Sequence, residues 1–197
     1  MERKELETAA ARVTHLRGLL AVPLGLLFIV TGLGNLAWGP FSHDRVFVGS
    51  VAIIAAAALL INRFYQDRYG RVTLTTRQQV RLTVASFTLF AAGLVGGTIL
   101  DSSFDLPVSL FACSFALAML AWFAFCVGLR THHIVIWGSL LIVGLLPLWG
   151  NLPDKVSVAW LPIGVATIAA GLFDHRALVR TFGAPAATTR EHLDVGA

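Results

Sequence analysis

Charged residues are scarce in this chain: they make up only 13% of its 197 residues, while 56% are hydrophobic. A soluble domain has about 25% charged residues. With half that charge, a globule of this length would have too little polar surface to remain in water. The composition therefore excludes a soluble domain and predicts an integral membrane protein with several spans.

Cysteine and lysine are also scarce. The two cysteines, Cys113 and Cys126, share one apolar run and are separated by about 20 Å along a helix. That distance is too long for a disulfide within the helix, which excludes a disulfide scaffold. The only lysines are Lys4 and Lys155, so the basic residues are almost all arginine. Together with abundant alanine, glycine and valine, this bias is typical of a bacterial protein.

Six apolar runs follow a polar N-terminal segment, and each is near the ~17–25 residues that a membrane-spanning helix needs. We therefore predict an all-α integral membrane protein with six transmembrane helices in three hairpins. Residues 1–17 are predicted to form a cytoplasmic helix, 18–183 the transmembrane domain and 184–197 a disordered cytoplasmic tail. The six runs are 18–38, 46–64, 82–100, 107–129, 134–149 and 156–173.

Basic residues alternate between the predicted loops and thereby orient the chain. Thirteen of the 15 lysines and arginines fall on the side that carries both termini, and only Arg45 and Lys155 fall on the other. Loops that face the cytoplasm carry this excess of positive charge. We therefore predict a bacterial plasma (inner) membrane protein with both termini in the cytoplasm.

Two further patterns concern the hairpins. GLLFIV at 25–30 matches GSLLIV at 138–143, so the first and third hairpins are either related by repetition or alike by chance. The three-hairpin layout and the run GLLFIVTG at 25–32 resemble bacterial membrane proteins of the acid-resistance HdeD-like group. This resemblance implies a six-helix bundle and assigns no role to any residue.

No Asp, Glu, Lys, Arg or His lies near the middle of any predicted span. Proton relays and ion pumps need such residues, because a change of charge couples the two sides of the membrane. Active transport of ions is therefore disfavoured. The chain also lacks HxxxH, CxxC and Gly-x-Ser-x-Gly spacings, so we expect no cofactor.

Titratable residues gather at the predicted inner ends of the spans. His132, His133 and His175 allow a metal site as one interpretation, since imidazole is the commonest metal ligand. The other interpretation is that they complement helix C-termini at the interface. Asp174, His175 and Arg176 are candidate catalytic residues of a lipid-modifying enzyme, although few inner-face acids accompany them to hold a divalent metal.

The segment 63–81 is the one cytoplasmic loop of any size, and it is rich in arginine. It predicts a docking site for a protein partner or for anionic lipid, where each basic residue contributes about 1 kcal/mol near the surface. The alternative is that these charges only orient the chain. No folded nucleic-acid-binding segment is present, so no nucleic-acid partner is expected. The candidate binding residues are Arg63, Arg68, Arg71, Arg77 and Arg81.

Small residues cluster in the third predicted span as two overlapping small-xxx-small pairs. Such pairs allow two helices to approach closely in lipid. They predict either packing within the monomer or the seam of a homodimer. The residues are Ala92, Gly93, Gly96 and Gly97.

Three functions follow from these features. The leading hypothesis is a non-enzymatic membrane subunit, accessory or regulatory to a transporter or membrane-tethered regulator, that docks through segment 63–81. The first alternative is a small transporter or channel for an uncharged or lipidic solute, with an outer cavity opened by kinks at Pro147 and Pro162. The second is a membrane-embedded lipid-modifying enzyme. Expected partners are membrane lipids and either a second copy or a larger membrane complex.

Overall fold

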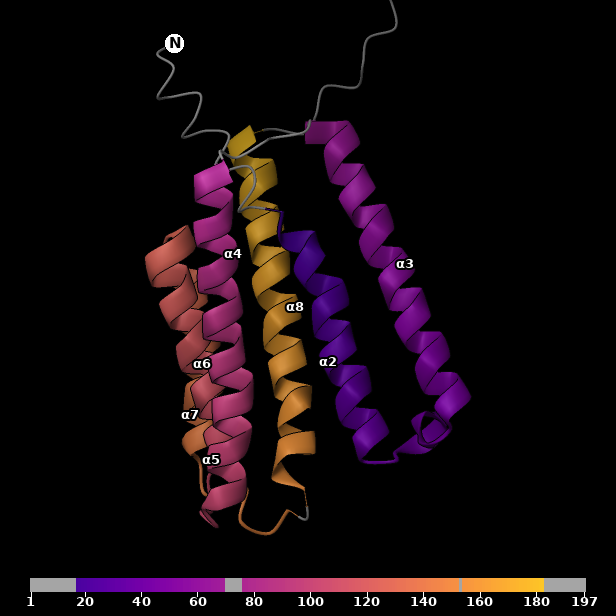
Figure 1. Cartoon of the computed structure of the whole chain (residues 1–197), viewed down its shortest axis with the longest axis vertical. Helices are drawn as coiled ribbons and strands as arrows, with labels where there is room; N and C mark the ends of the chain where they lie inside the picture. The colour runs from indigo at the N-terminus through magenta and orange to yellow at the C-terminus, as the bar shows by residue number, and fades with distance from the viewer. Residues whose placement is uncertain (1–16, 70–75, 153, 183–197) are drawn as a thin grey trace, which may run out of the picture.

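The computed structural model describes residues 17–69, 76–152 and 154–182. Within these residues all regular structure is helical, and the helices form an elongated bundle (Figure 1). This confirms the all-helical class. The predicted N-terminal helix and the predicted disordered tail lie outside the described residues, apart from Arg17.

Five helical stretches are long and apolar enough to cross a membrane: 18–35, 44–68, 82–103, 110–127 and 155–181. The fifth predicted span is shorter. Helix α7, Thr131–Leu145, has 15 residues, or about 22 Å of helix, against a hydrocarbon layer of ~30 Å. It ends at Leu145 because Leu146 turns extended ahead of Pro147, and a residue before proline disfavours helix.

The other helices follow the predicted runs closely. A short 3₁₀ turn, Gly18–Leu20, leads into α2, and a π-helical turn, Ala92–Gly96, joins α4 to α5 in one continuous rod. A second π-helical turn, Phe123–Val127, ends α6. The helix bounds are Ala21–Asn35 for α2, Asp44–Tyr69 for α3, Thr76–Ala91 for α4, Gly97–Ser103 for α5, Leu110–Trp122 for α6 and Lys155–Phe182 for α8.

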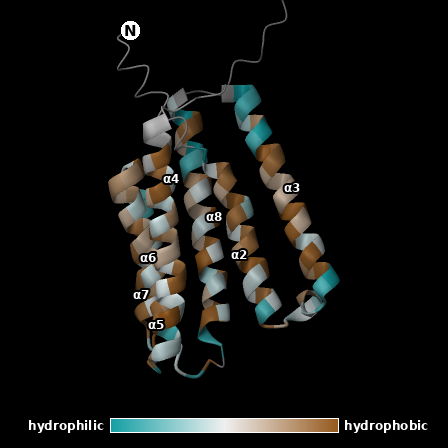
Figure 2. Cartoon of the chain, viewed as in Figure 1, coloured by the Kyte–Doolittle hydropathy of each residue, from teal (hydrophilic) through white to brown (hydrophobic). Residues whose placement is uncertain are grey.

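Helix α8 is the centre of the bundle, and α3 is its most peripheral member. α8 packs against α2, α6 and α7, whereas α3 packs on α2 and on the turns at the two ends of α2. Figure 1 shows α3 leaning away from the other helices. Figure 2 colours most of its ribbon as hydrophobic, with hydrophilic residues at its two ends.

Glycine brings α2 and α8 into backbone contact along their antiparallel seam. A Cβ on Gly25 would lie 2.6 Å from the carbonyl oxygen of Gly164, and a Cβ on Gly164 would lie 2.6 Å from that of Gly25. Any side chain at either position would therefore force the helices apart. The seam repeats every seven residues, with Gly18, Gly25 and Gly32 on α2 and its leading turn facing Gly171, Gly164 and Ser157 on α8.

Two of the four small residues of the third predicted span, Gly93 and Gly97, pack inside the chain. A Cβ on Gly93 would lie 2.9 Å from the Cβ of Ala118 on α6, and a Cβ on Gly97 would meet Ser114 on the same helix. A Cβ on Gly96 would meet nothing within 4 Å, and Ala92 is exposed. A homodimer seam on this helix stays a prediction.

The two ends of the bundle differ in charge. Arg17, Arg130 and Asp174 lie at one end, which we call the Asp174 end. The opposite end, which we call the Trp149 end, carries Lys155 together with Asp101, Asp105 and Asp154. In Figure 1 the Asp174 end is uppermost.

Candidate functional site

A buried carboxylate lies at the Asp174 end, where the first turn of α7 meets α8. The Nε2 atom of His132 lies 3.0 Å from Oδ1 of Asp174, and that of His133 lies 3.1 Å from the same oxygen and 3.2 Å from Oδ2. A guanidinium nitrogen of Arg130 is 3.9 Å away. A carboxylate can only accept hydrogen bonds, so each histidine donates from Nε2.

Local backbone geometry holds the two histidines in place. The π-helical turn closes with a 2.7 Å bond from the Gly128 N–H to the Phe123 carbonyl, and Gly128 then takes a φ of +107° that favours glycine. The chain thereby reverses into α7. The Phe123 ring stacks on His133 with centroids 3.6 Å apart, and His133 is only 1% exposed.

His132, His133 and Asp174 could hold a metal ion, because their ligand atoms all lie within 4.8 Å of one another. Two imidazoles and a carboxylate suit Zn²⁺ or Fe²⁺. A metal-bound imidazole, however, carries its hydrogen on the other nitrogen, which then needs an acceptor. The buried Nδ1 of His133 has no hydrogen-bond partner in the described part of the chain. The geometry therefore fits a carboxylate held by two imidazole donors better than a metal centre.

His175 turns away from this cluster toward α3. Its Nδ1 lies 2.9 Å from the hydroxyl oxygen of Tyr65, which also accepts a 3.1 Å bond from the backbone N–H of Leu19. Tyr65 is fully buried. This arrangement ties the end of α3 to the N-terminal turn and to α8. His175 therefore serves helix packing here and lies apart from the other two candidate metal ligands.

The three candidate catalytic residues point in different directions, as consecutive residues on a helix must. Asp174 faces the histidine pair, His175 faces Tyr65, and the exposed Arg176 lies 5.9 Å from the ring of Phe173. Sequence reasoning brought these three together by adjacency. The structure instead joins Asp174 to His132 and His133, about forty positions away. The predicted topology places all three at the inner ends of the spans but does not show which of them touch.

The arginine-rich segment is described only in part. Arg63 and Arg68 are exposed at the end of α3; Arg63 forms a 4.0 Å ion pair with Asp67, and Arg68 lies 5.5 Å from the ring centre of Phe64. Arg71 lies outside the described residues. Arg77 and Arg81 belong to α4, but their side chains are not among those described.

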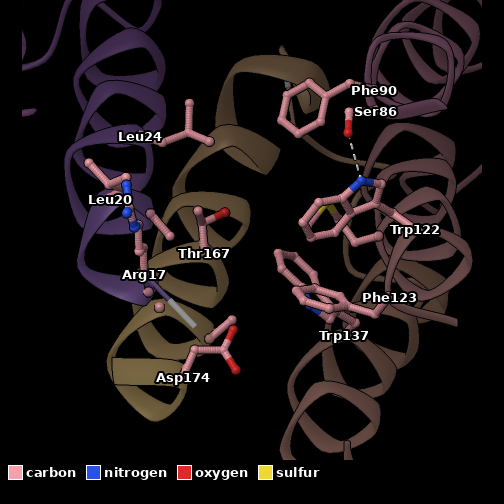
Figure 3. A pocket seen from close by; sticks show the side chains of 15 residues that line it. Arg17, Leu20, Leu24, Ser86, Phe90, Trp122, Phe123, Trp137, Thr167 and Asp174 are labelled. Atoms are coloured by element: carbon pink, nitrogen blue, oxygen red, sulfur yellow. Dashed lines mark hydrogen bonds between the residues drawn. The ribbon is translucent and has the colours of Figure 1, made fainter. Parts of the chain in front are cut away.

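A cavity of about 410 Å³ lies between the α2–α8 pair and the α4–α6 pair (Figure 3). This size is within the range of small-molecule sites, about 300–1,000 Å³. Its walls are almost entirely apolar, and Asp174 and Arg17 mark one end of it in Figure 3. The main apolar lining residues are Leu20, Leu24, Phe90, Met119, Trp122 and Phe123.

Most polar groups on the cavity wall bond to the protein itself. The indole N–H of Trp122 donates to Ser86 at 2.8 Å, and the Thr167 hydroxyl donates to the Ile163 carbonyl at 2.8 Å. Trp137 is an exception, because its buried indole nitrogen has no hydrogen-bond partner among the described residues. A buried donor without an acceptor costs about 1–3 kcal/mol. This feature was not recognised in the sequence, where Trp137 is one aromatic residue in an apolar run.

The described cavity is not the one predicted from the proline residues, and an outer cavity near Pro147 and Pro162 stays a prediction. Pro162 is inside α8, which continues through it, and Pro147 lies in the turn after α7. At that end the ring of Trp149 is buried and donates to the Val143 carbonyl at 2.9 Å. The described cavity, by contrast, is at the Asp174 end.

No protein-family model, curated protein or solved structure matches the chain. No family match therefore supports the resemblance in layout to the HdeD-like group. The function has to be argued from the geometry of the site.

Proposed function

We propose that this chain is a six-span bacterial inner-membrane protein, with both termini in the cytoplasm, that binds and carries a lipidic solute in the cavity. One observation carries the proposal: a cavity of about 410 Å³ has apolar walls and polar groups at one end. This polarity matches an amphiphile with one apolar chain and one polar end. A site for a sugar or an ion would need several convergent polar groups along its walls.

The distribution of the helices supports the six-span topology. α7 lies alongside α8 and alongside α6, which together with its π-helical turn spans 110–127. Both stretches are of membrane length, so α7 occupies the same apolar layer. Its 15 residues are fewer than usual, but a short span is accommodated by local thinning of the bilayer at a modest cost. The arginine excess on one side supports the proposed orientation.

The surroundings of the cavity suggest a lateral route from the membrane. Leu20 and Leu24 of the N-terminal turn and α2 form one wall, and Ser86 and Phe90 of α4 form another. α2 and α4 meet at the ring pair Phe28–Phe90, with centroids 6.2 Å apart, but they do not pack extensively on each other. A lipid chain could therefore enter between them.

A cavity-filling variant tests the proposal. We expect the wild-type protein, purified in mild detergent, to retain a bound amphiphile that mass spectrometry of extracted lipid detects. Met119→Trp fills the cavity and should remove most of it. Leu117→Trp is the matched control, because Leu117 is on the same helix and 54% exposed toward the outside. Equal retention by both variants, or no retention above the detergent background in the wild type, would contradict the proposal.

A second candidate is the accessory membrane subunit that docks through segment 63–81. The observation that favours it is α3, which presents exposed apolar residues along its length and the exposed Arg63 and Arg68 at its end. Crosslinking in native membranes tests it: Arg63→Ser with Arg68→Ser should reduce partner capture, and Arg45→Ser at the opposite end should not. Unchanged capture in the double variant would count against this function. The lipid-modifying enzyme stays a prediction without comparable support.

A further inference from the structure

The cavity wall carries a buried hydrogen-bond donor to which the described residues offer no acceptor. Trp137 lies on α7, is fully buried and lines the cavity, yet no residue that the structure describes forms a hydrogen bond with its indole nitrogen. An indole N–H can only donate, so the missing partner must be an acceptor. Buried donors without an acceptor are rare, and each one calls for an explanation.

Two other indoles in the bundle show what the fold normally does with this group. Trp122 donates to the hydroxyl of Ser86, and Trp149 donates to the carbonyl of Val143. Both indoles are held by acceptors from the protein. Trp149 does not line the cavity, whereas Trp122 and Trp137 both do, and Trp137 is the one nearer to the end marked by Asp174 (Figure 3). The position of the unpaired donor therefore coincides with the polar end of the cavity.

Asp174 does not serve as that acceptor, although it lines the same cavity. Both of its oxygens receive hydrogen bonds from the imidazoles of His132 and His133. No other oxygen of the described residues bonds to the indole N–H of Trp137. The acceptor would therefore arrive with the ligand.

We infer that the amphiphile proposed above is an acyl lipid whose carbonyl oxygen accepts a hydrogen bond from the indole N–H of Trp137. The inference rests on the proposed function and names the class of its ligand. The acyl chain occupies the apolar part of the cavity, beside Leu24, Phe90 and Met119. The carbonyl lies at the polar end. A fatty acid and a monoacyl ester share this chemistry, and an alkane of the same length lacks it.

Nuclear magnetic resonance of the ¹⁵N-labelled indoles gives a residue-specific test. The chain has five tryptophans, so five indole N–H signals are expected, and Trp137→Phe identifies one of them. We expect palmitic acid or monopalmitoylglycerol to move the Trp137 signal downfield, and hexadecane to leave it in place. The Trp149 signal is the internal control, since that N–H already has an acceptor. A shift with only one of the two acyl probes would identify the source of the carbonyl.

Binding affinity gives the second measurement. Trp137→Phe should weaken binding of the effective acyl probe by about five- to tenfold, the change expected from the loss of one hydrogen bond. It should leave the binding of hexadecane unchanged. Trp122→Phe is the matched control on the same cavity wall, because the Trp122 N–H is bonded to Ser86. It should keep the preference for acyl probes over hexadecane.

The outcomes separate the two proposals. If acyl probes and hexadecane bind equally to the wild type, and the Trp137 signal does not move, the inference is wrong and the cavity remains a lipid site. The inference is also wrong if, before any probe is added, the Trp137 signal already has the shift of a hydrogen-bonded N–H and exchanges with water. A water molecule would then be the acceptor. If no probe perturbs any cavity residue, the proposed function itself fails.

Discussion

Helix α2 has two long apolar neighbours, α8 and α3, and it packs much more extensively against α8 than against α3. The spans have nearly the same mean hydropathy, 1.9 for α8 and 2.0 for α3. Yet 44% of the residues in the apolar centre of α8 are buried, and none of those in α3. Hydropathy therefore identifies a span but does not determine which helices pack together. In lipid no hydrophobic force draws two apolar helices together, and close packing of small residues has to do so.

The difference lies in the residues between the helices. Gly25 and Gly164 let α2 and α8 meet backbone to backbone. Between α2 and α3, the corresponding close approach is at Gly34, where a Cβ would lie 2.9 Å from the Phe47 ring near the connecting turn. At its other end α3 is held by the hydroxyl of Tyr65. We therefore expect a rigid α2–α8 pair beside a helix that is attached mainly at its ends.

The largest expected effect comes from breaking the glycine seam. Gly25→Leu places a side chain against the Gly164 carbonyl and should lower the free energy of unfolding by about 3 kcal/mol. Gly49→Leu on α3 is the control, since a Cβ there meets nothing within 4 Å. Unfolding by denaturing detergent measures both variants. Equal losses for the two variants would show that the seam has no special role.

The next effect concerns how α8 is fixed to α7. Asp174→Asn replaces one carboxylate oxygen with an amide N–H, which then faces an imidazole N–H. Loss of the charge-assisted bonds should cost about 1.5–3 kcal/mol. Asp67→Asn, on the exposed end of α3, should change little, because exposed ion pairs contribute little. The same unfolding measurement applies, and a neutral Asp174→Asn would mean that the cluster does not stabilise the bundle.

A smaller effect is expected where α3 is attached. Tyr65→Phe removes the hydroxyl that joins Leu19 and His175, at a cost near the ~0.6 kcal/mol average for such bonds in membranes. The clearer readout is the distance distribution between spin labels on α3 and α8, which should broaden. Phe64→Leu, on the exposed face next to Tyr65, is the control. An unchanged distribution in Tyr65→Phe would show that other contacts hold α3.

The smallest effect belongs to the exposed face of α3. Ile53 is 71% exposed, and lipid chains can replace its contacts, so Ile53→Ala should change the free energy of unfolding by less than about 0.5 kcal/mol. Ile163→Ala, in the buried core of α8, should cost about 2–5 kcal/mol. A large loss for Ile53→Ala would mean that α3 is covered by protein rather than by lipid.

Much of the helical architecture could be predicted from the sequence, because hydropathy depends on composition within a short window. The run 156–173 marks α8, and the arginines give an orientation without any contact information. The bounds of the helix in the run 134–149 were harder to predict, because Pro147 shortens that helix to 15 residues. The peripheral position of α3 was not predictable from hydropathy, which is as high there as in α8.

The seam was missed for a specific reason. The small-xxx-small pattern has a spacing of four residues, and Gly93 and Gly97 fit it. The glycines of the seam, Gly18, Gly25 and Gly32, recur every seven residues and do not fit that pattern. The candidate site was found only in part: Asp174, His132 and His133 were singled out, but their contact spans about forty residues of sequence. The cavity and the unpaired N–H of Trp137 depend on the packing of several helices, which no local pattern encodes.

The most direct test of a lipid-binding cavity is to label it from the bilayer. Palmitic acid with a photoactivatable diazirine near the end of its chain is added to membranes that contain the protein, and mass spectrometry locates the crosslinks. The account predicts crosslinks at Leu24, Phe90 and Met119, on three different helices that meet at the cavity. Crosslinks confined to outward-facing residues such as Ile53, Leu117 and Val165 would contradict it.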